Sequence, residues 1–351
     1  MLESLGLDIS PRAASLWLGL LIGLAFGALA EVSRFCLRRA VAGPVAERKG
    51  AGAMWLAALA TAIAGTQLAQ HAGLVDLSGH RFLAADVPAL AIVLGGLMFG
   101  IGMVLARGCA ARLTVLAATG NLRAASVVVL IAIAALITLK GLLAPLATAL
   151  AGITLPLPAL AALPGAAIAI PLALAALAIA ARPGALTLAY GVAIGALVPL
   201  AWLGTGWLLL DDFDPVPVEA LSFIGPVADT LFWSVAATAI APGFGVGLVL
   251  GTLGGGALSA LIGRRTAWQS FHSPRETGRY ALGGALMGVG GVLAGGCTIG
   301  AGLTGVAALS SAALLALVAI IAGARAADRL LSASSAGSAG SAATQAPQPA
   351  R

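Results

Sequence analysis

The sequence predicts an all-α integral membrane protein that crosses the bilayer several times. Hydrophobic residues make up 60% of its 351 residues, charged residues only 9%, and the mean hydropathy is +1.05. A soluble domain carries roughly 25% charged residues, so this chain lacks the polar side chains to cover a water-facing surface. The 47 glycines favour close helix packing and interrupted helices, which are typical of transporters and channels. These observations exclude soluble enzymes, nucleic-acid-binding modules and disulfide-rich secreted proteins.

Apolar windows divide the chain into candidate helices. They are 15–33, 52–70, 88–106, 124–145, 159–180, 185–209, 226–241, 243–262, 280–294 and 303–324. A helix needs about 20 apolar residues to cross a bilayer, so the short window 226–241 predicts a half-span or re-entrant helix, and we expect about nine full crossings. Residues 1–331 then form a single transmembrane transport domain. The segment 332–351 is rich in Ser, Ala, Gly, Gln and Pro and is expected to be a disordered cytoplasmic tail.

The distribution of charge predicts the orientation of these crossings. Loops 34–49, 107–123 and 264–279 carry an excess of Arg and Lys and are expected to be cytoplasmic, whereas loops 71–86 and 211–219 are acidic and are expected outside. Nine crossings with the N-terminus outside and the C-terminus in the cytoplasm satisfy every loop. The net charge of +6 therefore reflects topology rather than a nucleic-acid partner. Residues 28–30 resemble a signal-peptidase site, but the preceding region lacks a positive excess, so we expect it to be retained.

An internal repeat links the two halves of the chain. Residues 99–109 match residues 287–297 at seven of eleven positions, and both segments end in Gly-Cys. Under the nine-crossing topology the two segments run in opposite directions, as in inverted-repeat transporters, whose sites lie at glycine-broken helices near the midplane. We expect repeat halves of roughly 15–150 and 226–325, helices that stop at Gly108 and Gly296, and a mid-membrane approach of Cys109 to Cys297. Two ordinary spans that happen to end in Gly-Cys remain an alternative.

A weaker echo relates two glycine series. Gly19-x-x-x-Gly23-x-x-x-Gly27 and Gly247-x-x-x-Gly251-x-x-x-Gly255 each lie in a span that leads into a basic loop. Glycine and alanine are so common in this chain that the echo alone is weak evidence of a repeat.

The three cysteines are the candidate functional residues: Cys36, Cys109 and Cys297. Their odd number and the absence of a C-x-x-C motif argue against a disulfide framework, a redox pair or a zinc site, and we expect no cofactor, metal or catalytic residue. A free cysteine is often only a small buried hydrophobe. Here, however, each cysteine closes a glycine-rich apolar segment, and arginines flank two of the three. A weak thiol donor beside a cation suits a sulfur-containing anion.

Three basic residues lie close to this predicted path. Arg107 and Arg112 flank Cys109 and would supply positive potential, although Arg107 also suits a plain cytoplasmic anchor. Lys140 falls within the window 124–145 and is expected either to extend its ammonium group to the interface or to add to the field of the path.

Six segments, in order along the chain, resemble the YeeE/YedE family of membrane proteins. They are Arg34-Phe35-Cys36-Leu37-Arg38-Arg39-Ala40, Leu105-Ala106-Arg107-Gly108-Cys109-Ala110-Ala111-Arg112, Thr119-Gly120-Asn121-Leu122-Arg123, Thr138-Leu139-Lys140-Gly141, Trp268-Gln269-Ser270-Phe271-x-Ser273-Pro274-Arg275 and Gly296-Cys297-Thr298-Ile299-Gly300. The resemblance extends over residues 16–325. One departure is Ala301, where such proteins often have Gln.

The resemblance implies a bacterial inner-membrane protein that imports thiosulfate. It implies that Cys36, Cys109 and Cys297 line a narrow path and pass the anion inward through S–H hydrogen bonds, without a stable covalent intermediate. Thr298 is carried over with its motif. The family also implies a possible cytoplasmic partner, a TusA-like sulfur carrier. The substitution at Ala301 leaves the substrate open.

Other readings of the same residues remain. A membrane sulfurtransferase would form a persulfide on one cysteine, although no His or carboxylate is adjacent to any of the three in sequence. A permease for selenium compounds or another anion would use the same scaffold, and a purely structural subunit would tolerate replacement of all three cysteines. No G-x-x-x-x-G-K-[ST] loop is present, so direct ATP coupling within this chain is not expected.

Overall fold

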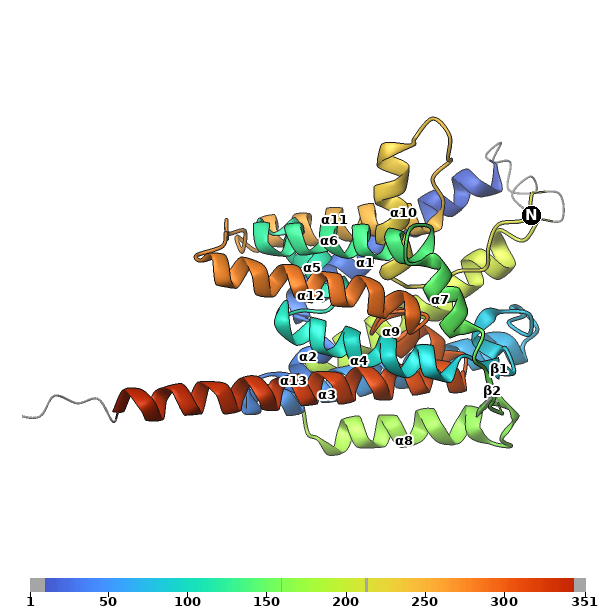
Figure 1. Ribbon diagram of the computed structural model, residues 1–351. Coiled ribbons are helices and arrows are strands. Elements are labelled where there is room, and N and C mark those ends of the chain that lie inside the picture. Colours follow the sequence, from blue (N-terminus) through green and yellow to red (C-terminus); the bar gives the residue numbers. More distant parts are fainter. Residues whose placement is uncertain (1–9, 159, 212–213, 344–351) are drawn as a thin grey trace, which may run out of the picture.

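The computed structural model describes residues 10–158, 160–211 and 214–343, which are almost entirely helical (Figure 1). Parts of the predicted N-terminal region, acidic loop and tail (1–9, 212–213 and 344–351) lie outside the described residues. The elements are α1 (Pro11–Ser33), α2 (Leu37–Ala42), α3 (Val45–His71), the 3₁₀ helix η2 (Arg81–Leu83), β1 (Asp86–Val87), α4 (Ala89–Leu105), α5 (Ala110–Ala118), α6 (Leu122–Leu139), α7 (Ala144–Ala151), β2 (Leu155–Pro156), the 3₁₀ helix η3 (Leu160–Ala162), α8 (Ala166–Ala180), α9 (Ala185–Leu203), the π-helix η4 (Gly204–Leu208), α10 (Ile224–Val235), α11 (Phe244–Ile262), α12 (Pro274–Leu293), the π-helix η5 (Gly300–Gly305) and α13 (Ser311–Ala343).

The lengths of these helices confirm a multi-pass membrane protein. Among the described residues, six stretches are long and apolar enough to cross a bilayer: Pro11–Ala42, Val45–His71, Ala89–Ala118, Leu122–Leu139, Ala185–Leu208 and Phe244–Ile262. Helix α8 has 15 residues and α10 only 12, fewer than the roughly 20 that a crossing needs. Helices dominate because a bilayer offers no water to satisfy backbone N–H and C=O groups. The short pair β1–β2 joins two loops, with Asp86 opposite Pro156.

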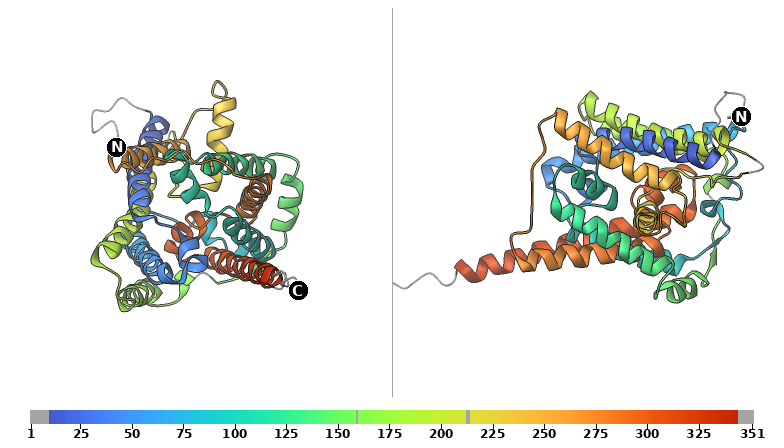
Figure 2. Two further views of the ribbon diagram at one scale, coloured as in Figure 1. Left: turned by 90° about the vertical axis from the view of Figure 1, so that its left-hand side faces the viewer. Right: turned by 90° about the horizontal axis from the view of Figure 1, so that it is seen from above.

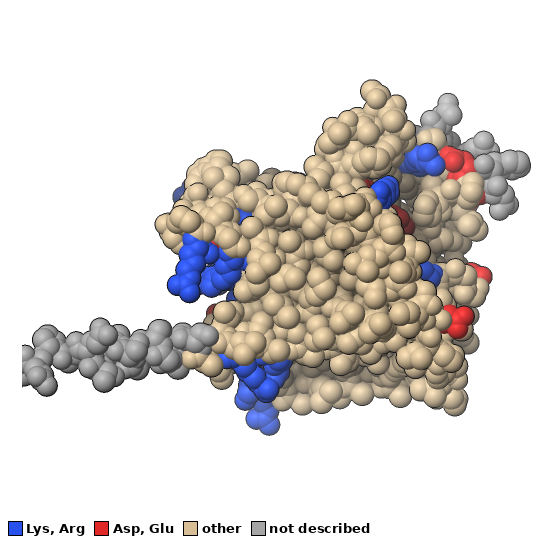
Figure 3. Space-filling model, viewed as in Figure 1, with Lys and Arg blue, Asp and Glu red and all other residues tan. Residues whose placement is uncertain are grey.

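The loops gather at two ends, as their charges predict. Arg48 binds Asp328 of α13 at 3.2 Å, and Arg123 binds Glu276 in the first turn of α12 at 2.9 Å. Arg265 binds Glu31, near the end of α1, at 2.6 Å. These three ion pairs bring the segments predicted to be cytoplasmic to one end of the molecule. In Figure 3, Lys and Arg gather at the end from which α13 projects, whereas the other end shows Asp and Glu together with some Lys or Arg. A broad uncharged band lies between the two ends.

The C-terminal helix is longer than its apolar window. Helix α13 spans Ser311–Ala343, so the backbone is helical through 332–343, in the first part of the segment expected to form a disordered tail. It projects beyond the other helices in Figure 1.

Glycines bring several pairs of helices into backbone contact, among them α1 with α11 and α4 with α12. The glycines of α1 face α11: Gly19 lies opposite Phe244 and Leu248, and Gly27 lies opposite Thr252 and Gly256, so the two helices run parallel. The weaker sequence echo is therefore the contact surface of two parallel helices that pack without side chains between their backbones.

The second glycine contact joins α4 to α12. Gly95 lies opposite Gly290, and Gly102 lies opposite Gly283, so these helices run antiparallel. Seen end-on in Figure 2, long helices surround the shorter, broken segments that carry the cysteines. Glycine contacts such as these two therefore help to build the frame around the candidate site.

Candidate functional site

Each cysteine follows a helix break with the same backbone shape. Arg34, Arg107 and Gly295 have positive φ angles of 55°, 59° and 72°, and a cysteine stands two residues after each of them. A left-handed residue ends a helix because it turns the chain out of the right-handed spiral. Cys36 then becomes the N-cap of α2 and Cys109 the N-cap of α5. The cysteines were expected at helix ends, but a left-handed residue two positions before each of them leaves no signal in the sequence, because it is Arg in two breaks and Gly in the third.

The eleven-residue repeat is also a repeat of hydrogen bonds. In α4, the N–H groups of residues 106, 107 and 108 donate to the carbonyls of residues 102, 104 and 103 at 2.9, 3.2 and 3.0 Å. In α12, residues 294, 295 and 296 donate to residues 290, 292 and 291 at 2.9, 3.1 and 2.9 Å. Every donor and acceptor is displaced by the same sequence offset. The helices stop just before Gly108 and Gly296, as predicted.

The three thiols are free and buried, and they lie in one region. Cys36, Cys109 and Cys297 have exposed fractions of 5%, 2% and 0%. The Cys36 and Cys109 thiols interact with each other, and the Thr298 hydroxyl faces the Cys109 thiol. Cys109 thus lies beside Cys36 on one side and beside the neighbour of Cys297 on the other.

The surroundings of Cys297 and Thr298 differ in their hydrogen bonding. The Cys297 Sγ accepts a hydrogen bond from the Gly300 N–H at 3.3 Å and also contacts the backbone of Phe223. The Thr298 hydroxyl is buried and has no hydrogen-bond partner among the described residues. A buried unpaired hydroxyl costs free energy unless a ligand or water satisfies it, so this group is available to a substrate.

Arg112 is a cation that acts on two of the thiols. Its guanidinium donates to the Ala30 carbonyl at 2.8 Å and interacts electrostatically with Cys36, Cys109 and Glu31. This half-buried arginine of α5 therefore places a positive charge near two of the three thiols.

An acidic residue that the sequence analysis missed lies behind Arg112. The Glu31 carboxylate accepts hydrogen bonds from the Arg265 guanidinium at 2.6 and 3.0 Å and from the Ser259 hydroxyl at 2.9 Å. Its side chain is 8% exposed, whereas that of Arg265 is 45% exposed. An acidic residue within an apolar span often marks a functional site. Glu31 falls inside the apolar window 15–33, so its position in the sequence could have identified it.

The other predicted basic residues lie away from the thiols. Arg107 has an exposed side chain, and its backbone forms the helix break. Lys140 is not inside a span: α6 ends at Leu139, and Lys140 is its exposed C-cap, with the ammonium 4.6 Å from the centre of the Phe232 ring. The expectation that Lys140 lies within a span was wrong, because the chain turns at Gly141 rather than continuing to residue 145.

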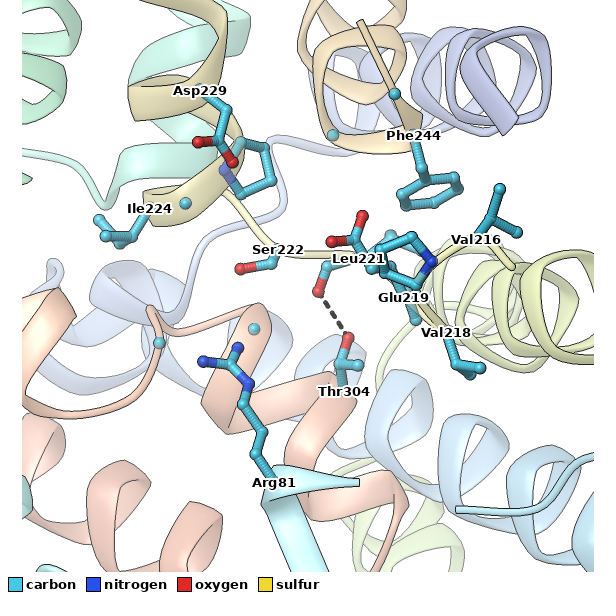
Figure 4. Close-up of a pocket in the computed structure, with 18 of the residues that line it drawn as sticks. Arg81, Val216, Val218, Glu219, Leu221, Ser222, Ile224, Asp229, Phe244 and Thr304 are labelled. Atoms are coloured by element: carbon cyan, nitrogen blue, oxygen red, sulfur yellow. Dashed lines mark hydrogen bonds between the residues drawn. The ribbon is translucent and has the colours of Figure 1, made fainter. Parts of the chain in front are cut away.

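A cavity of about 1120 Å³ opens beside Gly295 and Gly296 (Figure 4). Its wall includes the extended segment 216–222, which runs along the cavity from Val216 to Ser222, and the Arg81 side chain points into the cavity. The Thr304 hydroxyl fixes this segment by donating to the Leu221 carbonyl at 2.7 Å. Two residues further along, the backbone of Phe223 contacts Cys297. The cavity wall therefore leads to the thiol cluster.

The described residues contain no group of three or more His, Cys, Asp or Glu side chains that could hold a metal ion. Buried thiols, one unpaired hydroxyl, a guanidinium and a polar cavity together suit the passage of a small anion. A family model described as sulphur transport matches residues 32–326. The chain belongs to this family. The resemblance to the YeeE/YedE family is thereby confirmed, and sulphur transport membership indicates a sulfur-related transporter of the membrane. The comparison with curated proteins gave no match.

Proposed function

We propose that the protein imports thiosulfate, or a closely related sulfur oxyanion, through the cysteine-lined path. The observation that carries this proposal is the contact series from Cys36 to Cys109 and from Cys109 to Thr298, next to Cys297. A thiol is a weak hydrogen-bond donor, so it can hold a soft anion and release it again. Three such donors in sequence allow the anion to pass from one to the next without a covalent bond.

The surrounding groups have supporting roles in this proposal. Arg112 balances the anion's charge, and the Thr298 hydroxyl adds a donor beside Cys109. Gly108 and Gly296 allow the helix breaks: a Cβ at Gly296 would lie 2.7 Å from the Ala301 backbone nitrogen. Ala301 is buried, and it stands where members of the YeeE/YedE family often have Gln. Because the side chain differs here, sulfate-like or selenium oxyanions are alternative substrates to thiosulfate.

The proposed topology extends the same reasoning. The antiparallel packing of α4 on α12 supports an inverted repeat with halves of roughly 15–150 and 226–325, and about nine crossings with the N-terminus outside. The parallel packing of α1 on α11 does not follow such a repeat, so the glycine series is a packing motif only. The basic end then faces the cytoplasm of a bacterial inner membrane. It is where a TusA-like carrier would receive the sulfur compound.

Uptake of radiolabelled thiosulfate into proteoliposomes tests the proposal. Wild-type protein should accumulate label inside, and unlabelled sulfate, sulfite and selenite as competitors identify the preferred anion. Cys109→Ala should abolish uptake. Thr114→Val is a matched control on the same helix, because the Thr114 hydroxyl already bonds the Ala110 carbonyl at 3.0 Å and is not available to substrate. Normal uptake by Cys109→Ala would refute the cysteine path.

A membrane sulfurtransferase is the alternative from the enzyme class. It requires transfer of the sulfane sulfur of thiosulfate to a cysteine, with release of sulfite. Intact mass measurement after exposure to thiosulfate distinguishes the two functions. A mass increase of one sulfur atom on wild-type protein that is absent from one cysteine variant would favour the sulfurtransferase. An unchanged mass favours transport.

A further inference from the structure

The cavity beside Gly296 carries a balanced set of charges that the cysteine path does not use. Three basic and three acidic side chains line it among the described residues: Arg12, Arg81, Lys140, Asp76, Glu219 and Asp229. With all of them ionised the wall is neutral, and a dianion gains little by entering it. Protonating one or two carboxylates leaves a net positive charge, which attracts an anion.

Two of the cations are not ion-paired. Neither Arg81 nor Lys140 has a carboxylate oxygen within 4.0 Å among the described residues. Arg81 lies 5.1 Å from the centre of the Phe82 ring, and Lys140 lies over Phe232. In Figure 4 the Arg81 guanidinium points into the cavity, towards Ser222. Both positive groups are therefore free to bind a ligand.

A third donor in the same wall lacks a partner. Trp202 lines the cavity and is 1% exposed, and its indole N–H has no hydrogen-bond partner among the described residues. Buried polar groups are normally hydrogen-bonded. This orphan donor is independent of the charges and fits a site that holds an acceptor such as an oxyanion.

The backbone holds Glu219 firmly in place. The Thr205 hydroxyl accepts from the Glu219 N–H at 3.1 Å and donates to its carbonyl at 2.7 Å. Burial, together with nearby Asp229, raises the pKa of the Glu219 carboxyl above its ordinary 4.5, while Arg81 partly opposes this rise. The carboxyl therefore takes up protons at a higher pH than a solvated glutamate does.

Two other ionisable groups of the cavity, His80 and Asp76, do not take over this role. Burial, and to a lesser degree Arg81, lowers the pKa of the neighbouring His80 to about 4, so its imidazole is neutral. Asp76 accepts the Ser78 N–H at 2.8 Å within its own loop. Arg12 of α1, Arg81 before β1, Lys140 after α6 and Asp229 of α10 complete the charged groups of the wall.

We propose that this cavity is the external binding site for the anion, held by Arg81 and Lys140, and that anion binding is linked to protonation of Glu219 and Asp229. The inference rests on the proposed function and adds an entry site and proton linkage to it. The protons come from the outer solution and neutralise carboxylates that otherwise compete with the anion for the two cations. Because the segment after Glu219 reaches Cys297 through Phe223, the bound anion lies at the mouth of the cysteine path.

Thiosulfate uptake measured at several external pH values, with the internal pH fixed, tests this proposal. Wild-type uptake should fall roughly tenfold between about pH 5 and pH 8, as the carboxylates ionise. Glu219→Gln imitates the protonated state at every pH, so its uptake at about pH 8 should approach the wild-type value at pH 5. That gain cannot arise from misfolding. Arg81→Gln should lower uptake roughly tenfold at every pH.

Asp86→Asn is the matched control, since Asp86 is an exposed acid of the same end that does not line the cavity. It should keep the wild-type pH dependence. Uptake that is independent of external pH, or a Glu219→Gln variant that retains the wild-type decline, would overturn the proposal.

Equilibrium dialysis of labelled thiosulfate against the purified full chain separates this inference from the proposed function. If thiosulfate binds more tightly at about pH 5 than at pH 8, and Arg81→Gln abolishes this binding, the result supports the site. This holds even if liposomes show no uptake, because a lack of uptake would refute only the import function. Binding that does not change with pH or with Arg81→Gln overturns the site itself.

Discussion

The antiparallel contact between α4 and α12 predicts a large effect from a single methyl group. Gly290 packs against α4 so closely that a Cβ would lie 2.6 Å from the Gly95 carbonyl oxygen and 2.7 Å from the Phe99 nitrogen. Ordinary Cβ contacts begin near 3.4 Å, so the helices must separate by roughly 0.8 Å to accept Gly290→Ala. Both obstructing atoms belong to backbone and cannot rotate away. Overpacking of this kind costs about 2 to 3 kcal/mol.

The same helix offers a matched control. Gly278 lies in α12, is exposed, and has no atom within 4 Å of the position that an alanine methyl group would occupy. Gly278→Ala should be neutral or stabilise the protein by up to about 1 kcal/mol through helix propensity. The two Gly→Ala variants should therefore differ by about 3 kcal/mol in free energy of unfolding.

The buried thiols provide the assay. Because Cys36, Cys109 and Cys297 are all buried, a thiol-reactive fluorescent dye labels them only when the protein opens. Unfolding by SDS in mixed micelles, followed by dye labelling, gives the free energy of each variant. If Gly290→Ala proved as stable as Gly278→Ala, the backbone contact between α4 and α12 would be refuted.

Three further predictions follow from individual side chains. Thr298→Val should leave stability unchanged, since the Thr298 hydroxyl has no hydrogen-bond partner among the described residues, but it should reduce thiosulfate uptake up to about tenfold. Thr66 has another unpaired buried hydroxyl, and Thr66→Val should change neither stability nor uptake. Equal uptake by both variants would contradict a role for Thr298. Glu31→Gln should lower the melting temperature clearly and Glu47→Gln, in a more exposed ion pair, hardly at all; the reverse order would show that the Glu31 contacts are not stabilising. Burial lowers the pKa of His80 to about 4 from an ordinary 6.5, so the unfolded chain binds a proton that the folded chain does not. The stability that His80 contributes should therefore be complete above pH 6.5 and should be lost as the pH falls towards 4. Unfolding of His80→Phe at several pH values should show a flatter dependence than wild type, and an unchanged slope would exclude His80 as its source.

Composition and periodic hydropathy were sufficient for the general architecture. Helices form wherever the apolar windows fall, because the bilayer leaves the backbone no alternative, and loop charges sort the connections to two ends. Hydropathy averages over many residues, however, and cannot detect where a single turn ends a helix. That is why Lys140 was expected inside a span although the chain turns beside it.

The candidate site was only partly accessible to sequence reasoning. The rarity of cysteine and its recurrence after glycine identified the thiols, and the repeat predicted their matching backbones. Contacts between distant segments left no comparable pattern. Arg265 reaches Glu31 across 234 positions, and Glu219 meets Arg81 only because the segment 216–222 runs along the cavity that Arg81 also lines. These contacts depend on tertiary packing and not on how far apart the residues stand in the sequence.

The two matched helix breaks differ in one side chain. Their hydrogen bonds are equivalent, yet the left-handed position carries Arg107 in one and Gly295 in the other. Glycine adopts a positive φ at little cost, whereas a residue with a Cβ is strained there. The break at residue 107 therefore keeps an arginine where the backbone alone favours glycine, and it carries an exposed positive charge that the break at residue 295 lacks.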